Sequence, residues 1–455
     1  MKVWQFKGIL TKSGWLSPAY IETHEGKIQK IEKGLADSPN ADLDGYLIPG
    51  FQNAHSHAFQ YAMAGIAENR HQTGMKDDFW TWRSTMYEIA LKINPEQMRD
   101  IAAMVYSEMV KNGYTSVAEF HYLHHDPSGN EYENRAELGH QLIEAAKIAG
   151  IRITLVPVFY QKGGFGKPAE KYQRRFIFKS VDDYHRLLDQ TRRMTSDEAH
   201  ASLGIGVHSI RAADEYAIEE VLRLPFKKSP FHMHISEQTL EVDESEEFYG
   251  QRPVDWFLNK YQAPESLHLV HATHLTQAEV NLIADRKARV VLCPSTEGNL
   301  GDGIFPLKPF QALGGKWSIG TDSHIGLNPM EELRILDYGQ RLTTNHRDSF
   351  HSDTDSGLFA IRTCWEAGRA AMGQEDSEFF EVGAALDGLV ISNENPLVAA
   401  TGMDHLMSTI IYSSNPRDYK GVIVDGEWIY KDGQAKNGGA ILRNFLSVLK
   451  ELDIR

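Results

Sequence analysis

Cysteine is scarce in this sequence of 455 residues, which contains only Cys293 and Cys364. Two cysteines cannot form a disulfide framework, and these two lack the close spacing of paired metal-binding cysteines. Long apolar runs are also missing: no stretch of about 18 apolar residues is present to span a bilayer, and the N-terminus MKVWQFKGILTKSGW lacks the apolar core of a signal peptide. We therefore expect a cytoplasmic protein without a membrane partner.

Positive charge is in deficit as well. The chain has 47 Lys and Arg against 62 Asp and Glu, a formal net charge of -15. A nucleic-acid partner needs a basic face, and none is visible, so we exclude that class of function. With 42% hydrophobic and 24% charged residues, the composition is typical of a globular protein with a sizeable core. The length exceeds one ordinary domain and predicts two structural units.

The two ends of the chain are rich in short extended segments separated by turn residues. Residues 1–48 include VWQFKGIL and most of DGYLIPG, and residues 385–455 include LVISN, STIIYSS and GVIVDGEWIYKDG before a final helical segment, NFLSVLKEL. This pattern predicts that the two ends pair into one small β-sandwich with a C-terminal helix. The central domain then comprises residues 49–384.

Strand-like runs alternate with helical patterns through the central domain. The eight runs are IPGFQNAHSH, TSVAEFHY, RITLVPVFY, SLGIGVHS, PFHMHIS, LHLVHAT, ARVVLCPS and KWSIGTDSH. Intervening segments, such as PEQMRDIAAMVYSEMVKNG, carry apolar residues at helical spacing and end in glycine. Eight βα units predict an α/β fold of the (β/α)8 TIM-like barrel type, with the chemistry at the C-terminal ends of the strands.

Histidines and carboxylates concentrate at the ends of these runs. The first run ends in His55 and His57, the fifth in His232 and His234 followed by Glu237, the sixth in His271, and the eighth in Asp322 and His324. His55 and His57 are two apart, so both side chains leave the same face of a strand and can chelate one ion. Imidazole nitrogens suit zinc, and catalytic zinc keeps one position for water.

Several alternatives stay open on these residues alone. Either His232 or His234 could be the third ligand, and Asp322 could complete the shell, accept the proton of the bound water or cap a helix. A site with two metal ions often uses a carboxylated lysine on a middle strand, and the third and fourth runs contain no lysine. We therefore predict one ion, although Glu119 could in principle bridge two.

Four segments, PGFQNAHSH, HMHISE, LVHATH and GTDSH, resemble the amidohydrolase superfamily in this order. Further stretches, HAFQYAMAGIAE, DDFWTWRSTMY, VAEFHYLHHD, HSIRA and STEGNLGDGIFP, are similar to the family of formimidoylglutamate deiminases within it. The resemblance covers nearly the whole chain and departs at GAALDGLVI near the C-terminus. It implies a homodimeric hydrolase that uses one zinc ion per subunit to convert N-formimino-L-glutamate to N-formyl-L-glutamate and ammonia in histidine degradation.

The resemblance also implies roles for individual residues. The zinc ligands would be His55, His57, His234 and Asp322, and the residues that handle protons would be Glu237, His271 and Asp322. The substrate contacts would be Gln60, Arg83, Tyr122, His208 and Arg211. The two arginines would offset the repulsion between an acidic protein and a dicarboxylate substrate, since guanidinium binds carboxylate through two parallel hydrogen bonds. Whether Arg83 serves its own or a neighbouring subunit's site stays open.

Two rival functions share these features. A deaminase of a purine, pyrimidine or triazine ring would use the same metal and the same Glu, His and Asp set, but its pocket would favour aromatic stacking over paired arginines. A non-catalytic assembly protein with this fold would be expected to lose metal ligands, and every expected ligand type is present here.

Overall fold

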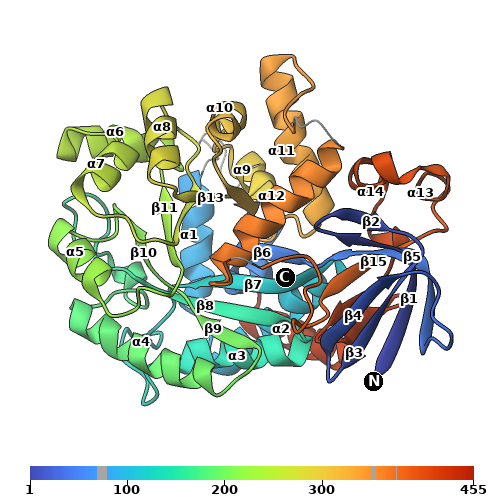
Figure 1. The fold of residues 1–455 in the computed structure, drawn as a ribbon. Coiled ribbons are helices and arrows are strands. Elements are labelled where there is room, and N and C mark those ends of the chain that lie inside the picture. Colours follow the sequence, from blue (N-terminus) through green and yellow to red (C-terminus); the bar gives the residue numbers. More distant parts are fainter. Residues whose placement is uncertain (69–78, 351–354, 376, 455) are drawn as a thin grey trace.

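The computed structural model describes residues 1–68, 79–350, 355–375 and 377–454 (Figure 1). Within these ranges the strands form two sheets of nine strands each. One sheet curves into a barrel surrounded by helices, and the other lies beside it and contains strands from both chain ends. None of the helices in the described ranges combines the length and apolar composition needed to cross a membrane.

Eight parallel strands build the barrel, one for each predicted run. They are β6 (Phe51–Ser56), β7 (Tyr114–His121), β8 (Arg152–Phe159), β10 (Ile205–Ser209), β11 (Phe231–Ile235), β12 (Leu267–His271), β13 (Arg289–Leu292) and β14 (Trp317–Ile319). The short strand β9 (Ala201–Leu203) adds to β8. The first and last strands meet through a bridge between Ser56 and Asp322. The predicted barrel is confirmed.

Helices follow the strands and cover the outside of the barrel. They are α1 (Phe79–Ala90), α2 (Pro95–Lys111), α3 (Glu137–Ala149), α4 (Val181–Ser196), α5 (Glu215–Arg223), α6 (Thr239–Tyr249), α7 (Pro253–Lys260), α8 (Gln277–Asp285), α9 (Pro294–Leu300), α10 (Leu307–Ala312), α11 (Pro329–Thr344) and α12 (Ser356–Ala371). Local sequence sets their ends: Asn94 and Gln97 form a capping box at the start of α2, and Gly150 ends α3 with a φ of 77°. Asn328 caps α11, so Asp322 is not needed as a cap.

The second sheet joins the two ends of the chain. Its strands are β1 (Lys2–Thr11), β2 (Gly14–Leu16), β3 (Ala19–His24), β4 (Lys27–Lys33), β5 (Ala41–Pro49), β15 (Gly388–Ser392), β16 (Tyr419–Val424), β17 (Glu427–Lys431) and β18 (Gln434–Ala435). β5 is central: it pairs parallel with β1 and antiparallel with β15, from Gly388 opposite Pro49 to Ser392 opposite Gly45. The predicted pairing of the two ends is confirmed, and the strands form one continuous mixed sheet. The prediction that STIIYSS is extended was wrong, because this segment lies in the helix α14 (Leu406–Ser413).

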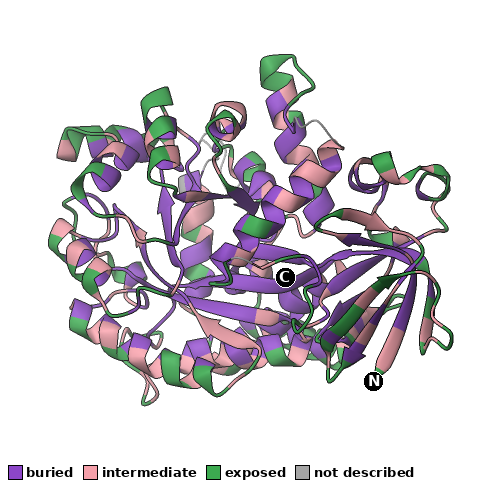
Figure 2. Cartoon of the chain, viewed as in Figure 1, coloured by how far each residue is buried: buried purple, intermediate pink, exposed green. Residues whose placement is uncertain are grey.

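The remaining short elements connect these layers. They are η1 (Ala58–Met63), η2 (Lys171–Gln173), α13 (Pro396–Ala400), η3 (Met403–His405), α14 (Leu406–Ser413), η4 (Pro416–Asp418) and α15 (Gly438–Leu452). The C-terminal helix α15 packs beside α2, where Gln97 donates a hydrogen bond to Glu451 at 3.1 Å. Figure 2 shows the burial pattern that results, with the barrel strands buried and the exposed residues on the outer helices. The polar residues at the barrel mouth are therefore enclosed by a large apolar core.

The backbone at Gly320 lies close to His55 where the barrel closes. It lies between β14 and the seam with β6, and a Cβ at this position would lie 2.8 Å from Cβ and 2.9 Å from the backbone N of His55. We expect Gly320→Ala to lower the free energy of unfolding by about 1–3 kcal/mol, because the backbone must shift to make room. Thermal unfolding followed by circular dichroism measures this effect.

Gly298→Ala is the matched control, because a Cβ there meets no atom within 4 Å. Equal melting temperatures for the two variants would contradict the close approach at the seam.

Candidate active site

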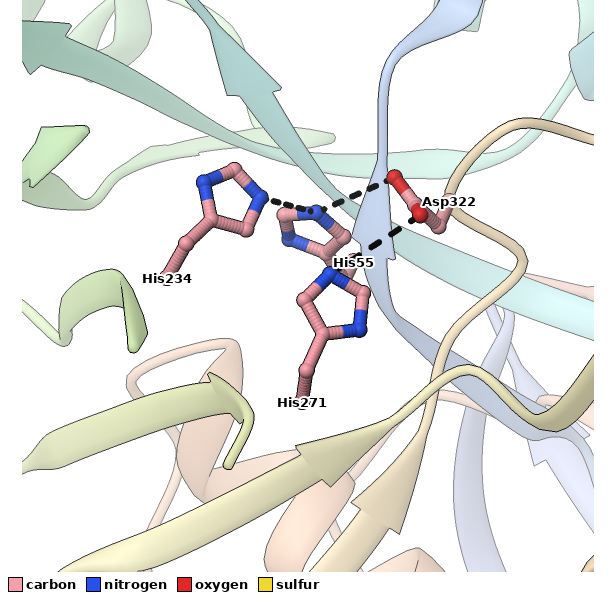
Figure 3. A group of neighbouring side chains, drawn as sticks. All are labelled: His55, His234, His271 and Asp322. Carbon is pink, nitrogen blue, oxygen red and sulfur yellow. Dashed lines mark hydrogen bonds and ion pairs between the residues drawn. The ribbon is translucent and has the colours of Figure 1, made fainter. Parts of the chain in front are cut away.

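The side chains singled out at the strand ends converge at one mouth of the barrel. His55 lies on β6, His234 on β11, His271 at the end of β12, and Asp322 beyond β14. Each offers one ligand atom, and these atoms all lie within 4.8 Å of one another (Figure 3). All four residues are buried. This group could hold a metal ion.

His57 lies against the same group. Its Nε2 is 3.1 Å from His55 Nε2 and 3.2 Å from Asp322 Oδ1, while His234 Nε2 is 3.0 Å from His55 Nε2. Ligand atoms about 2.0–2.1 Å from a tetrahedral zinc ion lie about 3.3 Å apart, so these spacings suit ligands of one ion. The structure thus brings the four predicted ligands together, and His271 lies within the same group.

The surroundings of His57 and His234 leave their Nε2 atoms as acceptors. His57 Nδ1 lies 2.8 Å from the Phe120 carbonyl and His234 Nδ1 lies 3.1 Å from the His208 carbonyl, so each Nδ1 carries the proton and donates it. Both Nε2 lone pairs therefore face His55 Nε2, at 3.1 Å and 3.0 Å. One proton on His55 Nε2 could satisfy only one of them, whereas a cation among the three rings would satisfy both. The donor set fits a divalent metal ion on this ground.

Burial keeps the imidazoles in the neutral form that binds metals. Burial lowers the pKa of His55 to about 3 and holds the pKa of His234 well below its ordinary value. The Asp322 carboxyl behaves in the opposite way: burial would raise its pKa, but a hydrogen bond from His55 and the charges of neighbouring histidines hold the pKa low. His55 and His234 therefore offer neutral nitrogens at neutral pH, and Asp322 offers a carboxylate.

The residues predicted to handle protons lie beside these ligands. His271 Nε2 is 3.6 Å from Glu237 Oε1 and 3.9 Å from Asp322 Oδ2. Burial, the largest cause, raises the pKa of Glu237, whereas for His271 burial is outweighed by the Glu237, Glu297 and Asp322 carboxylates, which raise its pKa to about 10. His271 and Asp322 also adopt positive φ angles of 66° and 44°. Strained backbone of this kind is common where function fixes a side chain.

The five predicted substrate contacts line a single cavity above this cluster. The cavity is lined by His57, His234, Glu237, His271 and Asp322 on one side and by Gln60, Arg83, Tyr122, His208 and Arg211 around them. Gln60 Nε2 donates to the Tyr122 hydroxyl at 2.9 Å. The other amide atom, Gln60 Oε1, is buried and has no hydrogen-bond partner among the described residues. Gln60 Oε1 could therefore accept a hydrogen bond from a ligand bound in the cavity.

The two arginines approach the cavity from different elements. Arg211 follows β10, is 8% exposed, and lies 3.8 Å from both Glu237 Oε2 and Glu241 Oε2, so it is not a surface ion pair. Arg83 lies on α1, and its Nε donates to the Tyr87 hydroxyl at 2.6 Å. Residues 77 and 78 of the DDFWTWRSTMY segment lie outside the described residues.

The structure distinguishes between alternatives that the spacing left open. His232 Nε2 lies 3.1 Å from the Ala371 carbonyl, away from the cluster, so His234 is the residue of this pair that faces it. Both carboxylate oxygens of Glu119 are engaged, by Ser56 Oγ at 2.6 Å and Ala58 N at 2.7 Å. His324 Nδ1 lies 2.9 Å from Thr321 Oγ1 and supports the strand end behind Asp322.

Sequence reasoning missed several residues of the site. Glu297 Oε1 lies 3.3 Å from His271 Nδ1 and orients that ring, although only the STE sequence after the seventh strand marked the segment. The aromatic wall of the cavity was also missed, and it consists of Phe79, Trp82, Tyr87, Tyr122, Tyr160 and Phe176. The FWTWR segment was a signal for part of this wall, and Tyr160 ends the third predicted run, RITLVPVFY, but Phe176 comes from the region after β8, which carried no such signal.

Known proteins resemble the chain over its full length. The model of the amidohydrolase family matches residues 46–429. The formimidoylglutamate deiminase of Pseudomonas aeruginosa is 40% identical over 449 residues, which cover 97% of this chain and 98% of that protein. The crystal structure of an amidohydrolase from Brucella melitensis has a TM-score of 0.93 at 35% identity and covers 99% of this chain and 100% of that chain.

A more distant solved structure shares the fold alone. It is an adenosine deaminase from Xanthomonas campestris with bound zinc, with a TM-score of 0.82 at 21% identity, covering 100% of this chain and 98% of that chain. The family model and the Pseudomonas aeruginosa relative include both the barrel and strands of the second sheet. This chain is therefore a member of the amidohydrolase family.

Proposed function

We propose that this chain is a zinc-dependent iminohydrolase that converts N-formimino-L-glutamate and water to N-formyl-L-glutamate and ammonia. One observation carries the proposal: Arg83 and Arg211 line the same cavity as Glu237 and three of the candidate metal ligands, His57, His234 and Asp322. The Pseudomonas aeruginosa relative is named for this activity. The proposal includes a cytoplasmic location, from the scarcity of cysteine, and a homodimer, from the family resemblance.

His55, His57, His234 and Asp322 would hold the ion, and zinc suits a site of this type because imidazole nitrogen is a preferred ligand. When bound, zinc lowers the pKa of a coordinated water molecule toward 7 and so makes a nucleophile available at neutral pH. His57 and His234 are held for this task by the carbonyls of Phe120 and His208. Such supporting bonds fix ligand orientation and raise ligand basicity.

Glu237 supplies the proton transfer that the reaction needs. Attack on the formimino carbon gives a tetrahedral intermediate that must expel one nitrogen, and an amide anion is a very poor leaving group. A carboxyl group whose pKa is raised by burial accepts a proton from water and returns it to that nitrogen at neutral pH. His271 Nε2 donates a hydrogen bond to the attacking oxygen, and Asp322 takes up the remaining proton as the intermediate collapses.

The residues around the barrel mouth would orient the substrate. The substrate carries two carboxylates, and we assign them to Arg83 and Arg211, which enter the cavity from α1 and from the segment after β10. Gln60 Oε1 is the buried acceptor that a substrate N–H would satisfy. Tyr122 and His208 complete the wall between these groups and the metal ligands.

One observation favours a second candidate function. The same cavity carries several aromatic side chains, among them Trp82, Tyr122 and Phe176, and such a wall could stack on a heterocyclic ring. A purine or pyrimidine deaminase would use them in that way, whereas the two arginines favour the dicarboxylate.

The deciding experiment compares substrates and identifies products. Zinc-loaded protein is incubated with formiminoglutamate, guanine or cytosine, and ammonia release is followed. The proposal requires preference for formiminoglutamate and formation of N-formylglutamate. Preference for a heterocycle would overturn the substrate, and glutamate with formamide as products would overturn the reaction.

Removing a ligand should remove the metal. We expect His234→Gln to reduce bound zinc from about one ion per chain to a small fraction, because a ligand fixed by the His208 carbonyl is lost. Metal analysis of purified protein measures this directly. His232→Gln on the same strand is the control and should keep its zinc, since His232 bonds to Ala371 instead. Full zinc occupancy in His234→Gln would contradict the assigned ligand set.

Glu237 should be needed for turnover but not for metal binding. We expect Glu237→Gln to lower kcat by about 10²–10⁴-fold, the range for loss of a general acid and base, with the zinc content unchanged. Steady-state ammonia release provides the measurement. Glu244→Gln, which alters a carboxylate of α6 paired with Lys167, is the matched control and should retain full activity. Comparable activity in both variants would rule out the proton transfer assigned to Glu237.

A further inference from the structure

A hydrogen-bonded set of side chains behind Arg83 has no part in the function proposed above. Gln173, at the end of η2, donates from one amide nitrogen to the Tyr160 hydroxyl at 2.9 Å and to the Tyr87 hydroxyl at 3.3 Å. Tyr87 accepts a second hydrogen bond, from Arg83 Nε at 2.6 Å. The set therefore connects the segment after β8 to α1 across one side of the cavity.

The orientation of the Gln173 amide is determined by its own surroundings. Its Oε1 accepts from the backbone N–H of Glu170 at 2.8 Å, so the amide nitrogen must face the two phenols. Gln173 is 1% exposed and cannot turn toward solvent. Burial, the largest cause, also raises the pKa of the Tyr87 hydroxyl, which stays neutral at physiological pH. The Tyr87 oxygen is thus held in place as a fixed acceptor.

Arg83 is constrained by this acceptor in two ways. Its guanidinium lies over the Tyr87 ring, with Cζ 5.2 Å from the ring centroid, and its Nε is tied to the hydroxyl of the same residue. A long arginine side chain otherwise loses up to about 2 kcal/mol of rotamer entropy when it is ordered by a ligand. Ordering the guanidinium in advance removes part of that cost from substrate binding.

We propose that Tyr87 and Gln173 are positioning residues that hold Arg83 at the cavity wall and thereby set the selectivity for a substrate with two carboxylates. The inference rests on the proposed function, because it takes Arg83 as the partner of one carboxylate. Neither positioning residue takes part in proton transfer, so their loss should affect binding more than the chemical step.

A double-mutant cycle tests whether Tyr87 acts through Arg83. We expect Tyr87→Phe to raise KM for formiminoglutamate about ten-fold, the size of one hydrogen bond to a charged group, while kcat changes less than about two-fold. In protein that already carries Arg83→Met, adding Tyr87→Phe should raise KM by less than about two-fold, because the group that Tyr87 positions is gone. Gln173→Met should also raise KM for formiminoglutamate. Independent, multiplicative effects of Tyr87→Phe and Arg83→Met would overturn the proposal.

Tyr172→Phe is the matched control. The Tyr172 ring packs 4.6 Å from the Tyr87 ring, but its hydroxyl bonds to Glu170. This variant makes the same chemical change next to the proposed pair and should leave KM within about two-fold of the wild type. Melting temperatures of all variants show whether a loss reflects unfolding. An increase in KM for Tyr172→Phe equal to that for Tyr87→Phe would overturn the specific role of Tyr87.

Two substrate analogues separate positioning from general packing. N-formimino-4-aminobutyrate lacks the α-carboxylate, and N-formimino-L-2-aminobutyrate lacks the side-chain carboxylate. Tyr87→Phe should lower kcat/KM for the analogue that keeps the carboxylate bound by Arg83 and leave the other nearly unchanged. Equal losses on both analogues would contradict the inference.

The closing measurement needs no turnover. Binding of glutarate, followed by calorimetry, should weaken in Tyr87→Phe and persist in Tyr172→Phe. The wild-type protein could fail to hydrolyse formiminoglutamate while glutarate binding is weakened by Tyr87→Phe and unchanged by Tyr172→Phe. In that case the proposed function fails and the positioning role stands. Equal glutarate affinity in both variants would overturn the positioning role whatever the substrate.

Discussion

The site depends on a short backbone seam that closes the barrel between β6 and β14. The His55 carbonyl accepts hydrogen bonds from Thr321 N at 3.1 Å and Asp322 N at 3.0 Å, and the Asp322 carbonyl accepts from His57 N at 3.2 Å. The Asn53 side chain reinforces the seam by donating to Thr321 Oγ1 at 2.7 Å and accepting from Thr321 N at 3.0 Å. Because the backbone holds these residues together, the spacing of the candidate ligands is set by the fold and not by the ion.

Burial then gives the residues at the barrel mouth their chemistry. An isolated charge is costly in this interior, so the imidazoles of His55 and His234 stay neutral and keep lone pairs for a cation. The same burial raises the pKa of the Glu237 carboxyl and suits it to carry a proton. Burial therefore favours the neutral form both in these two histidines, as candidate metal ligands, and in Glu237, as a candidate acid.

The sequence predicted the parts of the molecule that follow from periodic patterns. Parallel strands bring their C-terminal ends to one mouth, so side chains after successive strands, such as His234, His271 and Asp322, had to lie close together once the barrel was recognised. The choice between His232 and His234 needed coordinates, because both leave the same face of β11 and only their contacts distinguish them: His232 meets the Ala371 carbonyl, whereas His234 meets His55. Phe176 and Gln173 lie where the chain after β8 has no regular period, so no pattern could place Phe176 at the cavity or Gln173 beside its wall.

The two walls of the cavity come from different layers of the fold, and this separates chemistry from recognition. The candidate ligands and Glu237 lie at or directly after barrel strands, whose positions are constrained by the whole sheet. Arg83, Tyr87 and Gln173 come from α1 and from the segment after β8, which contact the sheet less directly. A change in this outer wall alters the charge and shape of the cavity without moving the ligands. A barrel of this family can therefore keep one hydrolytic centre and exchange a wall for a dicarboxylate with one for a heterocycle.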